Sequence, residues 1–120
     1  MKRKICLLIL LSLALSGCFF PKPTPNASIK ITSWEQDYSS YSEEYRYVYV
    51  YFEVTNTASV DIDYYEVWFD VKCADGSVYQ DWTNGSHLLV GKKLSDWTMI
   101  STAHKRAVSV TATDFRLWSY

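Results

Sequence analysis

The longest regular pattern in this chain is a period-two alternation over residues 45–55. Every second position carries a valine or a phenylalanine: Val48, Val50, Phe52 and Val54. The positions between them carry tyrosines and one glutamate: Tyr47, Tyr49, Tyr51 and Glu53. Side chains alternate across a strand, whereas a helix places every third or fourth residue on one face. The pattern therefore predicts a β-strand with one buried and one exposed face.

The rest of the chain also shows the residue patterns of strands and turns. Residues 65–73 alternate again, and the face expected to be buried carries Tyr65, Val67, Phe69, Val71 and Cys73. Asp75-Gly76 and Asn84-Gly85 are tight-turn pairs, while the polar stretch 33–44 predicts a loop. Further short strands are expected at residues 29–32, 77–82, 94–102 and 107–118. Together they predict an all-β fold, an antiparallel β-sandwich of about seven strands.

The first 17 residues have a different composition. Three basic residues (2–4) precede an apolar run at residues 5–15, which is shorter than the about 20 residues needed for a spanning helix. This is typical of a cleaved signal peptide. Leu15-Ser16-Gly17-Cys18 resembles the lipobox of bacterial lipoproteins, in which the cysteine thiol receives a lipid and cleavage occurs just before it.

That resemblance implies a division of the chain and an address. Residues 1–17 are the signal peptide, residues 18–26 a lipidated cysteine with a proline-rich tether, and residues 27–120 the β-sandwich domain. Cys18 would carry fatty-acyl chains such as palmitate and anchor the domain in membrane lipid. The implied location is the cell envelope, either on the outer side of the cytoplasmic membrane or, as Phe19 favours, at the outer membrane. Cys73 then has no disulfide partner in the mature chain and is expected to be a buried core thiol.

A second resemblance covers residues 45–118. Asn56 closes the segment Val50-x-x-x-Val54-x-Asn56, Ala74-Asp75-Gly76 ends the next apolar strand, and Val90-Gly91 precedes another. These features resemble the FxLYD-type immunoglobulin-like domains, whose naming motif is represented here by Phe69 and Val71. The resemblance implies an immunoglobulin-like sandwich that binds or supports other molecules and has no catalytic residues.

The residue types limit the chemistry that the chain can perform. After the leader, the chain has nine basic and thirteen acidic side chains, which gives a formal charge of −4. This charge argues against a nucleic-acid-binding protein. His87 and His104 lack further ligands at metal spacing, and the pair Asp61 and Asp63 lacks the additional oxygen ligands of a calcium site. We therefore predict no enzyme, no catalytic residues, no cofactor and no metal.

The tyrosines of residues 45–55 are the candidate binding residues. If residues 56–62 cross to a second sheet, residues 45–55 pair with the first strand, and Trp34 joins Tyr47, Tyr49 and Tyr51 in an outer patch. Trp68 would then lie on the opposite sheet, whereas a simple hairpin at residues 56–62 would place it beside the tyrosines. Exposed tyrosines suit binding, although strand propensity and cross-strand packing also favour such a row.

These observations predict a membrane-anchored, non-catalytic binding module at the bacterial cell envelope. Its partner would be an envelope protein or a polysaccharide. The alternative is a structural accessory subunit that docks permanently into a larger envelope assembly. An aromatic patch with polar neighbours would favour the binding module, whereas a broad, flat apolar face or an unprotected edge strand would favour the accessory subunit.

Overall fold

The computed structural model describes residues 23–120, so the predicted signal peptide, the lipobox-like motif and Cys18 lie outside the described residues. The described part contains strands and no helix. Its six strands are β1 (Ala27–Ser39), β2 (Glu44–Asn56), β3 (Ile62–Cys73), β4 (Val78–Leu88), β5 (Lys93–Ile100) and β6 (Ala107–Trp118). The predicted all-β class is confirmed, with six strands in place of about seven.

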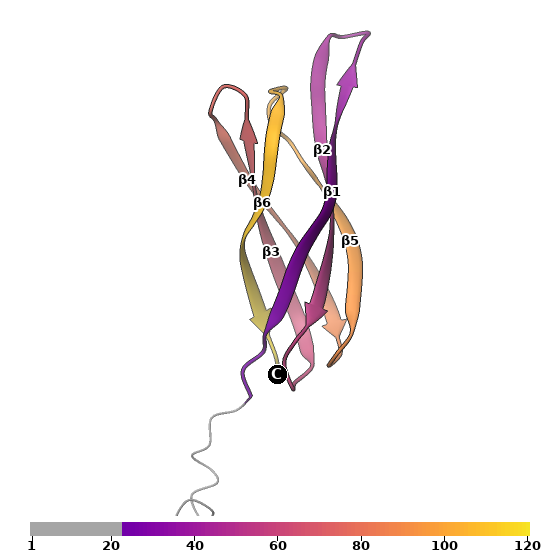
Figure 1. Ribbon diagram of the computed structural model, residues 1–120, viewed down its shortest axis with the longest axis vertical. Helices are drawn as coiled ribbons and strands as arrows, with labels where there is room; N and C mark the ends of the chain where they lie inside the picture. Colours follow the sequence, from indigo (N-terminus) through magenta and orange to yellow (C-terminus); the bar gives the residue numbers. More distant parts are fainter. Residues whose placement is uncertain (1–22) are drawn as a thin grey trace, which may run out of the picture.

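The strands form two antiparallel sheets of three strands that pack as a sandwich (Figure 1). The first sheet has the order β1-β2-β5, and the second has the order β4-β3-β6. Residues 57–61 carry the chain from one sheet to the other, so β2 pairs with β1, and Trp68 lies on the second sheet. Of the two arrangements left open by the sequence, this excludes the simple hairpin.

The core lies between the two central strands. Its β2 and β3 members are the alternating rows expected from the sequence: Val48, Val50, Phe52 and Val54 from β2, and Tyr65, Val67, Phe69 and Val71 from β3. The rings of Phe52 and Phe69 meet across the sandwich, with centroids 5.2 Å apart. Cys73 is buried at the end of its row, which confirms the prediction of a core thiol.

The turn predicted at Asn84-Gly85 is wrong, because both residues lie inside β4. Gly85 pairs with Tyr65 on β3, and the tyrosine ring lies over the glycine. A Cβ on Gly85 would be 2.2 Å from the Tyr65 hydroxyl oxygen, so only glycine fits. A glycine inside a strand often marks such a close approach. β4 therefore continues to Leu88, beyond the end of the strand predicted at residues 77–82.

The loop predicted over residues 33–44 is also wrong in most of its length. β1 continues to Ser39 and β2 begins at Glu44, so only residues 40–43 form a turn. The resulting hairpin rises beyond the rest of the sandwich, at the end opposite to the N-terminal side of the domain (Figure 1). Its rings at Tyr38 and Tyr45 pack together at 5.0 Å. Both faces of this hairpin are largely exposed, so it lacks the apolar alternation that identifies a strand in a sequence.

Candidate binding face

The outer face of the first sheet carries a continuous group of large side chains. β2 contributes Tyr47, Tyr49 and Tyr51, which are exposed or half-buried while the valines between them are buried, as predicted. The neighbouring edge strand β5 contributes Trp97 opposite Tyr51 and Met99 opposite Tyr49. Residues directly opposite each other in an antiparallel pair share a face. These five side chains are called the aromatic face below.

The alternation of β5 is the reverse of what a sandwich strand normally shows. Asp96 and Thr98 face the interior, whereas Trp97 and Met99 face solvent and are 54% and 43% exposed. Ile100 is buried and fixes this phase, because its partner is the buried Val48. Large apolar side chains on the outer face and polar ones on the inner face do not help the core. The arrangement therefore points to a use of this face outside the fold.

The free edge beside the aromatic face is partly blocked. The Trp97 amide donates a 2.8 Å hydrogen bond to the carboxylate of Asp96, so this amide is not available to an added strand. β4 repeats the arrangement, since the Trp82 amide donates to Asp81 at 2.8 Å. Inward-facing charges on edge strands discourage strand addition. A partner is therefore expected to contact the side chains of the face and not to extend the sheet.

A groove of about 480 Å³ hollows the end of the aromatic face that lies toward the β1–β2 hairpin. Its lining includes Tyr47, Tyr49 and Met99, together with polar or charged residues from neighbouring segments: Asp37, Arg46 and His104. The volume lies within the range of small-ligand sites, which combine apolar walls with a few polar groups. Rings and hydrogen-bonding groups therefore meet in one depression.

The loop between β5 and β6 forms one rim of this groove in a strained conformation. Ala103 and His104 both have left-handed backbones, with φ of 52° and 66°, and the Lys105 amide closes the turn onto the Thr102 carbonyl at 3.1 Å. Two consecutive left-handed residues are normally Asn-Gly or similar. His104 Nδ1 lies 3.0 Å from the Tyr45 carbonyl oxygen, which ties the loop to β2.

Gln36 holds the same loop from inside the sandwich. Its amide nitrogen donates to the Thr102 hydroxyl at 3.1 Å and to the Lys105 carbonyl at 2.9 Å. Its amide oxygen accepts the Ala107 N–H at 2.8 Å. These bonds keep the strained turn in place, and such over-determined strain is often found at functional sites.

The strain at this rim makes a stability prediction. Ala103→Gly should raise the free energy of unfolding by about 0.5–1 kcal/mol. Glycine adopts positive φ without a Cβ clash, and this gain exceeds the additional backbone entropy that glycine loses on folding. Urea denaturation followed by tryptophan fluorescence measures the change. Ala74→Gly, at a residue without positive φ, is the matched control and should be destabilising. Equal destabilisation by both variants would contradict the strained turn.

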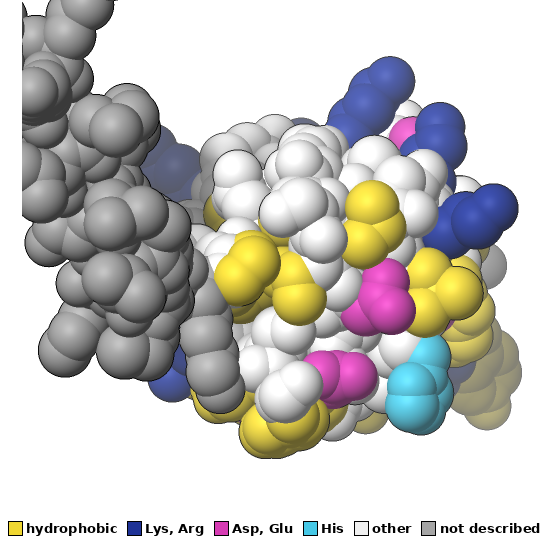
Figure 2. All heavy atoms as spheres, turned by 90° about the horizontal axis from the view of Figure 1, so that it is seen from below, with side chains coloured by type: hydrophobic (Ala, Val, Ile, Leu, Met, Phe, Trp, Pro, Cys, Tyr) yellow, Lys and Arg dark blue, Asp and Glu magenta, His cyan; other side chains and the backbone are white. Residues whose placement is uncertain are grey.

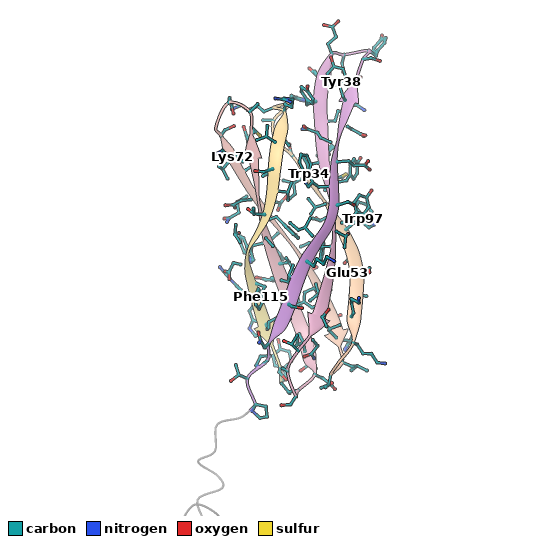
Figure 3. The ribbon with its side chains drawn as sticks, viewed as in Figure 1. Trp34, Tyr38, Glu53, Lys72, Trp97 and Phe115 are labelled. Carbon is teal, nitrogen blue, oxygen red and sulfur yellow. The ribbon has the colours of Figure 1, made fainter. Side chains whose placement is uncertain are left out.

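Trp34 does not join the aromatic face, and that prediction is wrong. β1 contains a bulge at Thr32, because Ile31 pairs with Phe52 and Ser33 already pairs with Tyr51. The extra residue reverses the two faces of β1 beyond this point. Trp34 therefore lies opposite Val50 and packs against the core. Figure 3 shows Trp34 on the inner side of β1, whereas Trp97, absent from the predicted patch, lies on the outer side of the first sheet.

Glu35 takes the outward position that Trp34 was expected to fill. The Tyr51 hydroxyl donates a 3.2 Å hydrogen bond to the Glu35 carboxylate. Partial burial raises the pKa of Tyr51, and the negative charge of Glu35 raises it further. The hydroxyl is therefore a neutral hydrogen-bonding group throughout the physiological pH range. The aromatic face consequently carries a carboxylate beside its rings.

The outer face of the second sheet is built differently. Trp82 on β4 stacks on Trp68 of β3 at 5.8 Å, and the Arg116 guanidinium of β6 lies 4.8 Å from the Trp68 ring centroid. This stack covers its central ring with other groups of the same sheet. Trp82 remains 42% exposed, similar to Trp97, and both tryptophans follow an aspartate in an edge strand. Trp82 thus offers a matched reference for the aromatic face.

The remaining sequence candidates do not gather into a further site. Asp61 and Asp63 each accept a backbone amide, from Val90 at 2.9 Å and from Tyr120 at 2.6 Å. Over residues 23–120 no group of three His, Cys, Asp or Glu side chains is arranged to hold a metal ion. In the same part of the chain no helix is long and apolar enough to span a membrane.

Comparison with known proteins gives no relative. No family model, no curated protein and no solved structure matches this chain. The interpretation of the aromatic face therefore depends on its own geometry.

Proposed function

We propose that this chain is a lipid-anchored, non-catalytic binding module of the bacterial cell envelope and that the aromatic face is its binding surface. The observation that carries the proposal is the reversed alternation of β5, which places Trp97 and Met99 in solvent beside the tyrosines. The lipobox ending at Cys18 supports the anchor. The resemblance to FxLYD-type domains supports a role without catalysis.

A polysaccharide is the partner class that this surface favours. Sugar rings offer apolar C–H faces for stacking on aromatic rings and hydroxyl groups for hydrogen bonds. The groove supplies both kinds of contact, with Tyr47 and Tyr49 on one side and Asp37, Arg46 and His104 around them. A peptide partner would often add a strand to a free edge, and the hydrogen bond between the Trp97 amide and Asp96 opposes this at the nearest edge.

The alternative of a permanently docked accessory subunit is less well supported. Such a subunit needs a broad apolar interface. The second sheet offers Trp82, but charged residues accompany it on the same outer face: Glu66, Asp70, Lys72 and Arg116. The Trp68 ring in its centre is already stacked. One binding face on the first sheet therefore fits the structure better than a molecule embedded on both sides.

The binding test compares two tryptophans in the same local setting. Trp97→Ser should weaken sedimentation of the protein with insoluble envelope polysaccharide by about tenfold, since hot-spot aromatics commonly contribute this much. Trp82→Ser should leave binding unchanged. The combined change of Tyr47, Tyr49 and Tyr51 to Ser should abolish binding with only a modest loss of thermal stability.

Two further results decide the outcome. Equal binding by the Trp97→Ser and Trp82→Ser variants would remove the aromatic face from the proposal. The partner is an envelope protein if two results occur together. The wild type would fail to bind polysaccharide, and a membrane protein that crosslinks to the wild type and to Trp82→Ser would no longer crosslink to Trp97→Ser.

The anchor is tested separately, because Cys18→Ser should abolish fatty-acid labelling and leave an uncleaved precursor or an unlipidated soluble form.

A further inference from the structure

The end of the sandwich nearest the N-terminal side carries exposed apolar side chains that the fold does not require. The loop between β4 and β5 presents Leu89 and Val90, which are 50% and 47% exposed. Tyr120 is almost fully exposed at the same end, where β1 begins and β6 finishes (Figure 1). Single exposed aliphatics are ordinary, but two at a turn tip beside a tyrosine form a surface of defined chemistry.

The turn that carries these aliphatics is held in place. The Lys92 amide donates to the Leu89 carbonyl at 3.0 Å, and Gly91 has a φ of 71°, as the third residue of a type II turn requires. The Val90 amide donates to the Asp61 carboxylate at 2.9 Å. Leu89 and Val90 are therefore presented by a hydrogen-bonded turn.

The last residues of the chain are fixed to the same end. The Ser119 hydroxyl donates to the Asp61 carbonyl at 2.7 Å, and the Tyr120 amide donates to the Asp63 carboxylate at 2.6 Å. These bonds keep Tyr120 beside the loop between β2 and β3. The end face thus combines aliphatic side chains with a tyrosine that has an apolar ring and a polar tip.

This end carries both lysines and carboxylates, and most of the carboxylates already have partners within the domain. Lys92 and Lys93 follow the aliphatic tip directly, and Lys93 lies 3.7 Å from Glu53. The carboxylates of Asp61 and Asp63 each hold a backbone amide. Figure 2 views the molecule from this end and shows hydrophobic side chains interspersed with acidic ones, with lysine or arginine side chains at the border of the face. Lysine stems and tyrosine rings are suited to the membrane interface.

We propose that this end face, formed by Leu89, Val90 and Tyr120 with Lys92 at its border, docks into the interfacial layer of the bilayer that holds the anchor. The proposal depends on the anchor at Cys18 but not on the partner of the aromatic face. Nine Cα–Cα steps separate Cys18 from Ala27 and span at most about 30 Å. The end face is therefore always within reach of the membrane, and a short tether greatly raises its effective concentration there.

The test measures depth in the membrane at two opposite ends of the molecule. Mature lipidated protein is placed in vesicles of phosphatidylethanolamine and phosphatidylglycerol, with an environment-sensitive fluorophore on Val90→Cys or on Tyr41→Cys. Tyr41 is fully exposed at the tip of the distal hairpin and is the matched control. The native Cys73 is buried, so labelling selects the introduced thiol.

The label at position 90 should shift to shorter wavelength and lose most of its emission to lipid-borne quenchers, whereas the label at position 41 should do neither. Adding Leu89→Asp to Val90→Cys should lower the quenching at position 90 at least severalfold, because a charge in the apolar layer is unfavourable. Equal quenching at positions 90 and 41, or no effect of Leu89→Asp, would overturn the proposal.

The same samples separate this proposal from the proposed function. Loss of membrane association in Cys18→Ser with normal polysaccharide binding would confirm the anchor and leave the aromatic face untouched. Retained fatty-acid labelling in Cys18→Ser would show that the anchor assignment is wrong. A water-exposed label at position 90 in a protein that still binds polysaccharide would reject the docked end face alone.

Discussion

Gly85→Ala is expected to destabilise the domain by about 3 kcal/mol, which is the upper part of the range for overpacked cores. The new Cβ would be 2.2 Å from the hydroxyl oxygen and 2.3 Å from Cζ of Tyr65. The tyrosine side chain, the first of its row, is fully buried, so it cannot turn into solvent. Either β4 must move away from β3 or the ring must leave its rotamer. Urea denaturation monitored by tryptophan fluorescence measures the loss.

A double-mutant cycle shows whether the ring is the cause. Tyr65→Leu removes the clashing atoms and should itself be destabilising, because a large core side chain is truncated. Gly85→Ala in the Tyr65→Leu background should then be nearly neutral, a coupling of about 2 kcal/mol or more between the two sites. Thr83→Ala, one inward position away on β4, controls for any effect of alanine in this strand. Additive free energies would show that the glycine is needed for another reason.

Among residues 23–120 the Tyr65 hydroxyl has no hydrogen-bond partner, although it is fully buried. Burial raises the pKa of this phenol, and the negative charge of Asp96 raises it further. Both effects favour the neutral phenol. The unpaired hydroxyl is an energetic cost of fitting a tyrosine against Gly85, so Tyr65→Phe should be neutral or slightly stabilising.

The parts of the fold that were predictable from the sequence are those set by local alternation. Alternate residues from Val48 to Val54 and from Val67 to Cys73 are buried, because every second side chain of a central strand faces the core. The same alternation placed Tyr47, Tyr49 and Tyr51 outside. The burial of Cys73 followed from its phase alone.

The errors arise where a contact with a distant residue overrides the local pattern. Asn84-Gly85 has the residues of a hairpin turn. In the structure, however, the ring of Tyr65, twenty positions earlier, occupies the space where a side chain at position 85 would lie, so the glycine is required inside a strand. Trp34 has the correct parity for the outer face until the bulge at Thr32 changes that parity. Neither event leaves a signal in its own neighbourhood.

Trp97 and Met99 were missed for a related reason. Counting back from Ile100 in steps of two assigns Thr98, Asp96 and Leu94 to the inner face. Although Leu94 is apolar, that phase puts Asp96 and Thr98 inside and Trp97 and Met99 outside, which contradicts the usual rule for a core. The contradiction was itself the signal, because a strand that violates the rule is most simply explained by a second requirement on its outer face.

The second large effect is expected at Asn56, which is only 2% exposed at the end of β2. Its side-chain nitrogen donates to the carbonyls of Val60 and Leu88, both at 2.9 Å, and its oxygen accepts the Ala58 amide at 2.9 Å. Asn56→Ala leaves these three backbone groups without their partner, so the free energy of unfolding should fall by about 2–3 kcal/mol. Asn26→Ala, which removes one exposed side-chain acceptor, should cost less than about 1 kcal/mol.

Asn56→Asp gives the same prediction a pH dependence. Aspartate keeps the shape and the acceptor but presents a second oxygen to two carbonyls, and burial disfavours its charged form, so its pKa in the folded protein should be raised above the usual value of about 3.9. The folded protein then binds more protons than the unfolded chain above that value. The stability of Asn56→Asp should therefore fall as the pH rises from about 4, until the folded-state pKa is passed. A pH-independent difference from the wild type would contradict a buried charge at this position.

The effect of Asn56→Ala is also expected to be local. Asn56 joins the crossing at residues 57–61 to Leu88, the residue before the exposed pair Leu89 and Val90. Hydrogen exchange of Asn56→Ala should therefore accelerate first at the amides of residues 57–61 and 89–92, while β1 and the start of β2 stay protected. In the vesicle experiment the label at position 90 should become less deeply quenched, and binding through Trp97 should be retained. Uniform acceleration across both sheets would instead show that Asn56 supports the whole sandwich and not the crossing alone.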